Sequence, residues 1–400
     1  MQNHPADQEP RRVLGSFFAP KSQNTPTWEQ RKLTNLCEKF TDGDWIEAKD
    51  QSDSGVRLVQ TGNVGVTEYL DKPNNKKWIS FETFEQLHCE EVYPGDILIS
   101  RLPEPAGRAC IMPNLGTKMI TAVDCTIVRP NAVTSTRFLL QYLSSQAYFD
   151  AVNTCLAGGT RQRISRGNLA QFNVPIPSSK IEQEKIGEVL EKLDTLITLH
   201  QRKYEKLVNI KKSMLDKMFP QNGASVPEIR FKGFTDPWEQ RKLGEMVDVC
   251  SGMDYKHLSE GDIPVYGTGG YMLSVNKALS YDRNAVGIGR KGTIDKPYIL
   301  KAPFWTVDTL FYAIPKDSKN IDFTFDVFQK VDWKKKDEST GVPSLSKIAI
   351  NETSISTPSK LEQERIGSFF RNLDTLITLH QRKLEKLQNI KKSCLEKMFV

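Results

Sequence analysis

The sequence of 400 residues is long enough for two or three domains, or for two copies of one domain with additional helices. A hydrophobic fraction of 38% is low for one large core, and a net charge of +6 is compatible with nucleic acid as a partner. No apolar stretch of about 18 residues and no signal peptide is present, so we expect a cytoplasmic protein without membrane contact. None of the seven cysteines has a metal-ligand spacing, and we expect free thiols and no metal site.

Residues 1–26 are polar and contain prolines, which predicts a loose N-terminal arm. The phrase WEQRKL follows at Trp28–Leu33 and opens a first domain, which we place at residues 27–178. Short β-type runs in this domain occur at Gly55–Gln60, Asp96–Arg101, Cys110–Pro113 and Met119–Val128, and Thr136–Ala151 is typical of a helix. The segment is therefore predicted to be a mixed α/β domain.

A long helix is predicted at residues 179–219, because apolar side chains recur there at alternating spacings of four and three. This period of 3.5 residues is typical of a coiled-coil seam. The seam includes Leu193, Ile197, His200 and Leu207. Pro220 and Gly223 end the helix, and residues 220–236 are expected to form a linker.

The second half of the chain repeats this organisation. WEQRKL occurs again at Trp238–Leu243 and opens a second domain, placed at residues 237–358. Its β-type runs are Ile263–Tyr266, Ala285–Ile288 and Tyr298–Leu300. A second helix is predicted at residues 359–400, with a seam that includes Leu373, Ile377, His380 and Leu387.

The two helices are near copies of each other. Lys180–Phe219 and Lys360–Phe399 share 29 of 40 residues, and the eleven letters LDTLITLHQRK begin unchanged at Leu193 and at Leu373. The segments between the repeated phrases look unrelated, and the first is about 30 residues longer than the second. The pattern indicates a constant frame around two exchangeable domains.

The periodicity alone permits two directions of helix pairing. A parallel, in-register pair would bury Lys211 beside Lys391, and buried like charges cost several kcal/mol. We therefore favour an antiparallel pair, in which Lys211 lies opposite Leu373 and Lys391 lies opposite Leu193. Pairing between two chains is the alternative, but the internal duplication favours pairing within one chain.

The same antiparallel register places His200 opposite Leu384 and His380 opposite Tyr204. Polar residues in a coiled-coil seam more often set the register than bind a metal or act as a base. We expect a structural role for both histidines.

No motif of a catalytic site is found in the sequence. Gly287–Gly292 fits the pattern GxGxxG, but strand-like residues follow it where a dinucleotide site needs a helix. A P-loop, a methyltransferase motif of the Asp/Asn-Pro-Pro-aromatic type, a GxSxG turn and an HExxH pair are all missing. The sequence argues against an enzyme and against a cofactor bound by this chain.

Arginine and lysine residues are clustered in glycine-containing loops of both domains. Arginine can bind phosphates or the edge of guanine, and glycine lets the backbone approach a phosphate closely. A single arginine is more often a solvated surface residue, but clusters at corresponding places in both domains favour DNA contact. The candidate DNA-binding residues are Arg101, Arg108, Arg161, Arg163 and Arg166 in the first domain, and Arg290, Lys291, Lys334, Lys335 and Lys336 in the second.

The combined pattern resembles the DNA-specificity subunit of type I restriction–modification systems. The resemblance rests on the alternation of divergent domains with near-identical helices, on the two WEQRKL phrases and on the phrase IGRKGTI. It rests further on the proline-containing helix starts, at Pro175–Ile186 and Pro358–Ile366, and it covers Trp28 to Phe399. It implies an α+β fold, with two mixed α/β target-recognition domains separated by two long antiparallel coiled-coil helices and related by a pseudo-two-fold repeat.

The resemblance also implies a function. Each domain would read one half of a bipartite double-stranded DNA target, and the unequal domains imply that this target is not a palindrome. The helices would bind two methyltransferase subunits, which use S-adenosylmethionine, and restriction subunits that use ATP and Mg would join them. Partner contacts are expected near the helix starts, at Ile181, Glu182 and Gln183 and at Leu361, Glu362 and Gln363.

Two other classes of function are possible for a chain with this organisation. A coiled-coil scaffold that only joins two protein partners would have no reason to diversify both domains so completely. A stand-alone methyltransferase would need the cofactor and catalytic motifs that the sequence lacks.

Overall fold

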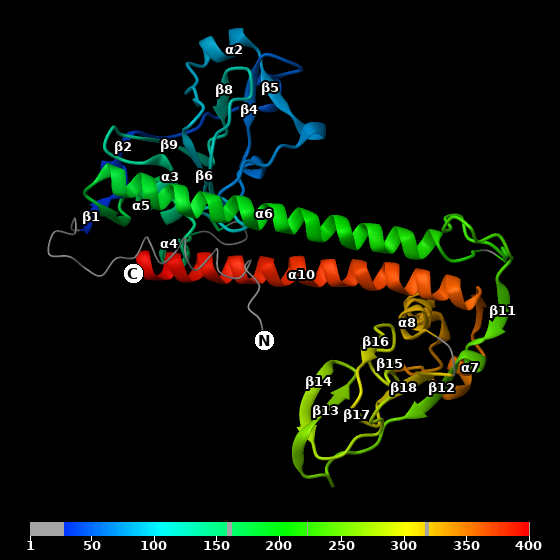
Figure 1. Ribbon diagram of the computed structural model, residues 1–400. Helices are drawn as coiled ribbons and strands as arrows, with labels where there is room; N and C mark the ends of the chain where they lie inside the picture. Colours follow the sequence, from blue (N-terminus) through cyan, green and yellow to red (C-terminus); the bar gives the residue numbers. More distant parts are fainter. Residues whose placement is uncertain (1–27, 158–161, 222, 317–319, 400) are drawn as a thin grey trace. The chain divides into compact units, whose positions relative to one another are not determined.

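The computed structural model describes residues 28–157, 162–221, 223–316 and 320–399 (Figure 1). The predicted N-terminal arm at residues 1–26 lies outside the described residues, as does Arg161. The chain forms two compact units: unit 1 combines residues up to Thr198 with those from Glu385 onward, and unit 2 is Leu199–Leu384. Within the described ranges, we find no helix with the length and apolar character needed to cross a membrane.

In unit 1, the first WEQRKL phrase forms a strand of the repeated frame. This strand, β1 (Trp28–Lys32), pairs antiparallel with β10 (Asn173–Pro177), which leads into the long helix α6 (Lys180–Lys217). The backbone N–H of Leu33 donates to the carbonyl of Phe172 at 2.8 Å. The chain therefore enters and leaves the first domain at the same place.

Unit 2 repeats this arrangement. The second phrase forms β11 (Glu239–Lys242), which pairs antiparallel with β19 (Ser354–Thr357) before the long helix α10 (Lys360–Met398). The N–H of Leu243 donates to the carbonyl of Thr353 at 2.9 Å, as Leu33 does in unit 1. Both helices lie within the ranges predicted from the seam, while the six-part domain division stays a prediction.

The two divergent domains share one sheet topology although their sequences look unrelated. Each contains a four-stranded antiparallel sheet, in the order β2-β9-β6-β7 in unit 1 and β12-β18-β15-β16 in unit 2. In unit 1 these strands are β2 (Cys37–Asp42), β6 (Ile97–Ser100), β7 (Ala109–Ile111) and β9 (Cys125–Pro130). In unit 2 they are β12 (Val247–Ser251), β15 (Ala285–Gly289), β16 (Tyr298–Leu300) and β18 (Leu310–Pro315). The internal repeat thus extends to the domains.

A second sheet in each domain contains one parallel strand pair. In unit 1 its strands are β3 (Gln51–Ser52), β4 (Val56–Val59), β5 (Lys77–Ile79) and β8 (Met119–Thr121). In unit 2 they are β13 (Glu260–Gly267), β14 (Gly270–Val275) and β17 (Trp305–Thr306). The parallel pairs are β4–β8 and β13–β17. The run predicted as one strand at Met119–Val128 is instead β8 and β9, because a turn at residues 122–124 separates two strands that belong to different sheets.

Short helices complete both domains. Unit 1 contains α2 (Phe81–Gln86), α3 (Thr136–Tyr142), α4 (Gln146–Thr154) and α5 (Arg166–Ala170), with 3-10 turns at Leu33–Leu36, Ala48–Asp50, Thr61–Asn63 and Pro73–Asn75. Unit 2 contains α7 (Leu243–Met246), α8 (Ile321–Lys330) and α9 (Lys347–Asn351), with a 3-10 turn at Trp333–Lys336. The helix predicted at Thr136–Ala151 is broken because Ser145 caps a new one: its hydroxyl accepts from the N–H of Tyr148 at 3.2 Å.

Each domain docks onto a long helix where that helix carries a glycine. A Cβ atom on Gly187 of α6 would lie 2.8 Å from the backbone nitrogen of Phe138 in α3. One on Gly367 of α10 would lie 2.7 Å from the backbone nitrogen of Phe323 in α8. A side chain at either position would push the domain off its helix, so the repeat keeps glycine at both.

An ion pair of opposite polarity lies beside each of these contacts. In unit 1, Arg137 Nε of α3 is 3.1 Å from Glu191 Oε2 of α6. In unit 2, Arg371 Nη1 of α10 is 2.8 Å from Asp322 Oδ2 of α8. Glu191 and Arg371 occupy the same position of the two repeats, so the base is on the domain in one unit and on the long helix in the other.

The end of each long helix closes an aromatic cluster. Phe219, just after α6, contacts Trp238 and Phe323 at centroid distances of 5.6 and 5.7 Å. Phe399, just after α10, contacts Trp28 and Phe138 at 6.2 and 5.5 Å. Each cluster therefore joins the start of a domain, a helix of that domain and the end of the other repeat's helix.

The two long helices pack antiparallel, as predicted. In unit 1, Lys391 Nζ near the end of α10 is 2.5 Å from Asp194 Oδ1 in the first half of α6. In unit 2, Lys211 Nζ near the end of α6 is 2.5 Å from Asp374 Oδ1 in the first half of α10. Each lysine thus contacts a carboxylate next to the leucine that the predicted register placed opposite it. In each unit, the seam positions are buried or half-buried.

The predicted neighbours of the two seam histidines were wrong in one respect. His200 and His380 contact each other, with 2.8 Å between the two Nδ1 atoms. One ring has to donate and the other to accept, so at least one of them is neutral. Neutral rings do not repel, which allows a contact that charged rings would not.

We expect Phe399→Ala to lower the free energy of unfolding by about 3 kcal/mol or more, because it removes a buried ring from the core of unit 1. Phe219→Ala should do the same in unit 2. Urea denaturation measures both. Phe81→Ala is the matched control, since that ring is 56% exposed and its loss should change little. Equal effects of the three substitutions would contradict a role of the helix ends in the fold.

The histidine pair predicts a loss of stability in mild acid. Burial lowers the pKa of His200 and His380, and the nearby Lys203 and Lys383 lower both further. Since the unfolded chain then takes up protons at a higher pH than the folded chain, the free energy of unfolding should fall as the pH drops from about 7 to about 5. Chemical denaturation at several pH values should show a smaller fall for His380→Gln and an unchanged one for His257→Gln. A wild-type slope in His380→Gln would refute the assignment.

Candidate nucleic-acid interface

In unit 1, the structure brings together two predicted basic segments that are far apart in the sequence. Arg101 directly follows β6, and Arg163 and Arg166 flank the serine that caps α5. The N–H of Ile164 donates to the carbonyl of Arg101 at 3.2 Å and holds the segments side by side.

Two aspartates link the three arginines. Asp42 Oδ1 is 3.5 Å from Arg101 Nε, and its Oδ2 is 3.8 Å from Arg166 Nε. Asp124 Oδ1 is 4.0 Å from Arg101 Nη2 and 3.5 Å from Arg163 Nη1. The three cations exceed the two anions by one charge, and the outer two arginines are exposed. This arrangement can present guanidinium groups to an anionic ligand.

Two of the predicted DNA-binding arginines have internal roles instead. Arg101 is 7% exposed, and its Nη2 donates to the carbonyl of Val123 at 2.5 Å. Arg108 donates to the carbonyls of Thr61, Val64, Leu102 and Pro105, and burial lowers its pKa. Both guanidinium groups fix loops, and DNA contact by either residue stays a prediction.

Unit 2 places its basic residues on the same backbone framework. Arg290 directly follows β15, as Arg101 follows the equivalent strand β6. The N–H of Leu345 donates to the carbonyl of Arg290 at 2.9 Å, as Ile164 does to Arg101. Lys291 is exposed beside this contact and forms a β-bridge with Ser344. The basic loops of the two domains therefore lie at equivalent positions of the fold.

The lysines of the turn at Trp333–Lys336 lie near this loop. Lys334 Nζ is 2.9 Å from Asp295 Oδ2, which lies in the segment after Lys291. Lys335 pairs with Asp332, and the side chains of Lys334 and Lys335 are 74% and 82% exposed. These cations are free to contact solvent or a ligand, and Lys336 is exposed as well.

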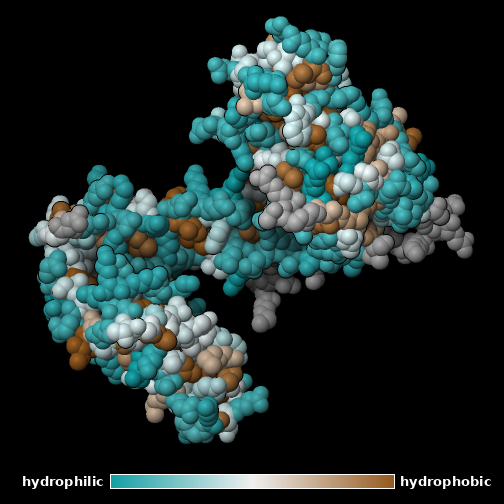
Figure 2. Space-filling view, turned by 180° about the vertical axis from the view of Figure 1, so that it is seen from behind, coloured by the Kyte–Doolittle hydropathy of each residue, from teal (hydrophilic) through white to brown (hydrophobic). Residues whose placement is uncertain are grey.

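The structure also shows candidate residues that the sequence did not indicate. Lys347 is the first residue of α9 after the capping Ser346, the place that Arg166 has after Ser165 in unit 1. Asp42 and Asp124 orient the arginines of unit 1. A serine before a short helix could have indicated Lys347, but nothing local marks the two aspartates. The face drawn in Figure 2 is mostly hydrophilic, and its hydrophobic side chains lie in small groups.

Half of the predicted partner-binding residues are buried. Gln183 is 2% exposed, and its amide oxygen accepts from the N–H of Ser135 at 2.8 Å. Glu362 is 1% exposed and forms two hydrogen bonds of 2.7 Å with Arg230. Gln363 is 3% exposed and donates to the carbonyl of Pro358. These three residues hold the frame together, and contact of any of them with a partner stays a prediction.

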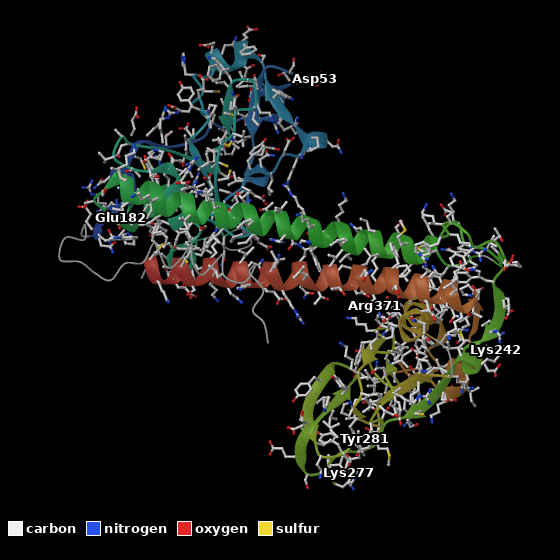
Figure 3. The ribbon with its side chains drawn as sticks, viewed as in Figure 1. Asp53, Glu182, Lys242, Lys277, Tyr281 and Arg371 are labelled. Atoms are coloured by element: carbon white, nitrogen blue, oxygen red, sulfur yellow. The ribbon has the colours of Figure 1, made fainter. Side chains whose placement is uncertain are left out.

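The other three residues at the helix starts are at least partly accessible. Ile181 is 66% exposed and Leu361 is 59% exposed, at equivalent positions of the two repeats. Glu182, labelled in Figure 3, accepts from the indole N–H of Trp28 at 3.2 Å. Exposed apolar side chains at both helix starts are compatible with a protein partner.

Across the residues that the structure describes, no group of three or more His, Cys, Asp or Glu side chains could hold a metal ion. All seven cysteines are among these residues, and each is a free thiol. Gly287 and Gly289 belong to β15, Gly292 follows it, and the next element is strand β16, where a dinucleotide site would need a helix.

The chain matches the family described as type I restriction modification DNA specificity domain, over residues 26–209 and 235–389. It is 22% identical over 398 residues to a Methanocaldococcus jannaschii protein provisionally assigned as the type I restriction enzyme MjaX specificity subunit, and the match covers 91% of each chain. The type I restriction enzyme MjaVIII specificity subunit of the same organism is 22% identical over 259 residues, which are 55% of this chain and 60% of that protein.

A solved structure gives an independent comparison of the fold. The S subunit of a type I restriction-modification system from M. genitalium superposes with a TM-score of 0.70 at 17% identity. The superposition covers 95% of this chain and 98% of that chain. The α+β fold, with two β-rich domains and two long paired helices, is therefore shared.

We expect Arg166→Ala to weaken DNA binding by the assembled complex. Loss of a phosphate contact should reduce the slope of log affinity against log salt by about 0.9. Loss of a base contact should instead reduce the discrimination between bases at one position of the DNA target by about 1–3 kcal/mol. Arg101→Ala should instead lower stability, because it removes the buried centre of the network. Fluorescence anisotropy at several salt concentrations measures the first effect. Lys192→Ala, an exposed cation on α6, is the control; unchanged affinity in Arg166→Ala would refute the assignment.

Proposed function

The chain belongs to the type I restriction modification DNA specificity family, and we propose that it reads a bipartite, non-palindromic DNA target, one half with each domain. It is a DNA specificity subunit of a non-catalytic family, so methylation and cleavage would be activities of its partners.

The single observation that carries this proposal is one scaffold with two different sets of loops. The four-stranded antiparallel sheets of both domains have the same strand order, and Arg101 and Arg290 follow equivalent strands. The surrounding groups differ: unit 1 has an arginine–aspartate network, whereas unit 2 has a lysine-rich turn. Two readers built alike but carrying different side chains would recognise different sequences.

The paired strands at the base of each domain support independent reading. Because β1 lies against β10 and β11 lies against β19, each domain is an insertion whose two ends are adjacent. An insertion of this kind can be exchanged without changing the path of the frame. Each domain would therefore determine its own half of the target.

The repeated helices support two copies of one partner. Leu196 and Leu199 on α6 are 42% and 44% exposed, and the equivalent Leu376 and Leu379 on α10 are 43% and 44% exposed. Packing inside the chain does not require identical side chains at exposed positions, but recognition of the same partner surface would. We infer that these leucines, with Ile181, Leu361 and Glu182 nearer the helix starts, bind two methyltransferase subunits. S-adenosylmethionine would be held by those subunits, and ATP and Mg by restriction subunits.

A domain exchange tests this function. Residues 34–172, which lie between β1 and β10, are replaced by the corresponding first-domain segment of a family member with a known target. One half of the methylated sequence should change to that of the donor, while the second half stays unchanged, because residues 244–353 still form the other reader. Methylome sequencing of cells that express the chimera with the methyltransferase subunit gives the result. The control is the donor's second-domain segment grafted at residues 244–353, which should change the other half and leave the first unchanged.

A chimera that assembles but alters both halves of the target would contradict independent reading. A chimera that assembles and retains the original target would show that the exchanged segment does not read DNA.

A further inference from the structure

A pocket of about 580 Å³ lies between α8 and α10 in unit 2. Asp322, Asp326 and Gln329 of α8 line it, together with Asp374 and other residues of α10. Arg371, which is labelled in Figure 3, also belongs to its wall. The pocket reaches the exposed leucines of the repeat, because its lining includes Leu379.

Two of the three acids in this pocket are paired within the protein. Asp322 Oδ2 is 2.8 Å from Arg371 Nη1, and Asp374 Oδ1 is 2.5 Å from Lys211 Nζ. Their negative charges are balanced by cations of the same unit. The third acid is not balanced in this way.

Asp326 is 1% exposed and has no ion-pair partner among the residues that the structure describes. Its Oδ2 also lacks a hydrogen-bond donor, and so does the buried Oε1 of Gln329 one turn along the same helix. Burial raises the pKa of Asp326 well above its usual range, and the charge of Lys211 opposes this rise. Two residues of the pocket wall thus each have a buried hydrogen-bond acceptor without a donor.

The other unit shows that the fold does not need an acid here. Gln141 on α3 is six residues after the helix cap, as Asp326 is on α8. The amide of Gln141 donates to Asp194 Oδ2 at 2.9 Å, and Asp194 also accepts from Lys391. A neutral side chain thus makes the equivalent contact in unit 1, where the Oε1 atom of Gln141 is likewise buried without a hydrogen-bond donor. The carboxylate at position 326 is an addition that packing does not explain.

We infer that this pocket receives the guanidinium group of an arginine from the methyltransferase partner. The inference rests on the proposed function, since it places one residue of the partner beside the exposed leucines Leu376 and Leu379 of α10. A guanidinium carries a fixed charge for Asp326 and several N–H donors, enough for Asp326 and Gln329 together, whereas an ammonium group is a compact point charge. Phe325 also lines the pocket, and Lys211 Nζ lies 5.6 Å from the centroid of its ring.

The charges around the pocket further define the partner. Lys301 and Arg382 also line it, and neither has an ion pair among the described residues. These cations would repel a lone arginine. The partner segment should therefore carry a carboxylate beside the arginine, so that the acid faces Lys301 and Arg382 while the base enters the pocket.

The experiment compares the affinity of full-length variants for the purified methyltransferase subunit by calorimetry without DNA. Asp326→Asn should weaken binding by about 30-fold or more, because the partner's arginine would lose its buried anion. Asp326→Gln, which installs the residue of unit 1, should have the same effect. Asp254→Asn, an exposed acid of unit 2 that does not line the pocket, should leave the affinity unchanged.

A second measurement identifies the arginine. Each surface arginine of the methyltransferase subunit that has a neighbouring acid is changed to glutamine and tested against wild type and Asp326→Asn. One arginine should show a loss that does not add to the loss from Asp326→Asn. Wild-type affinity of both Asp326 variants, or additive losses for every arginine, would overturn the inference. Thermal unfolding of each variant excludes misfolding, and Asp326→Gln replaces Asp326→Asn if the latter does not fold.

Failure of this inference can be separated from failure of the proposed function. Leu376→Asp changes the partner surface outside the pocket. If Leu376→Asp weakens binding but both Asp326 variants bind normally, the partner surface is supported and the arginine site is refuted. If the wild-type chain does not bind a methyltransferase subunit at all, the proposed docking itself falls, and the arginine site with it.

Discussion

The structure depends on two phenylalanines at the ends of its two long helices. Phe219 completes the aromatic cluster around Trp238, and Phe399 completes the one around Trp28. Each ring is contributed by the helix of the other repeat, so neither cluster can form before both repeats are present. The strand pair at each domain base and the antiparallel ion pairs, such as Lys391 with Asp194, extend outward from these clusters. Burial of these two rings thus joins the two repeats of the chain.

Much of the frame could be predicted from the sequence, because its determinants are local or repeated. The seam has a regular period, and the antiparallel direction followed from the cost of burying Lys211 beside Lys391. The common topology of the two domains could not be predicted, since sheet order depends on pairing between strands far apart in the chain. The contact between His200 and His380 was missed for a related reason. The seam pattern shows which residues face the other helix, but it does not show that one neutral imidazole ring donates a hydrogen bond to another.

The candidate interface shows a similar division. Clustered basic residues indicated these loops as candidates, and the backbone bonds from Ile164 to Arg101 and from Leu345 to Arg290 place the loops alike in both units. Sequence could not separate exposed arginines from buried ones. Arg101 is buried because Asp42, 59 residues earlier in the chain, lies within 3.5 Å of it. Clusters of basic residues in the sequence therefore indicate a candidate surface. Tertiary contacts decide which arginines and lysines of that surface are accessible.

The reversed ion pairs beneath the domains bear on how such genes recombine. A segment encoding the second domain, copied into the first position, would bring Asp322 against Glu191, and both are acids. The reciprocal copy would bring Arg137 against Arg371, and both are bases. In this chain, each domain therefore fits the polarity of its own position and not that of the other. A domain taken from the corresponding position of a chain with the same polarity would avoid both conflicts.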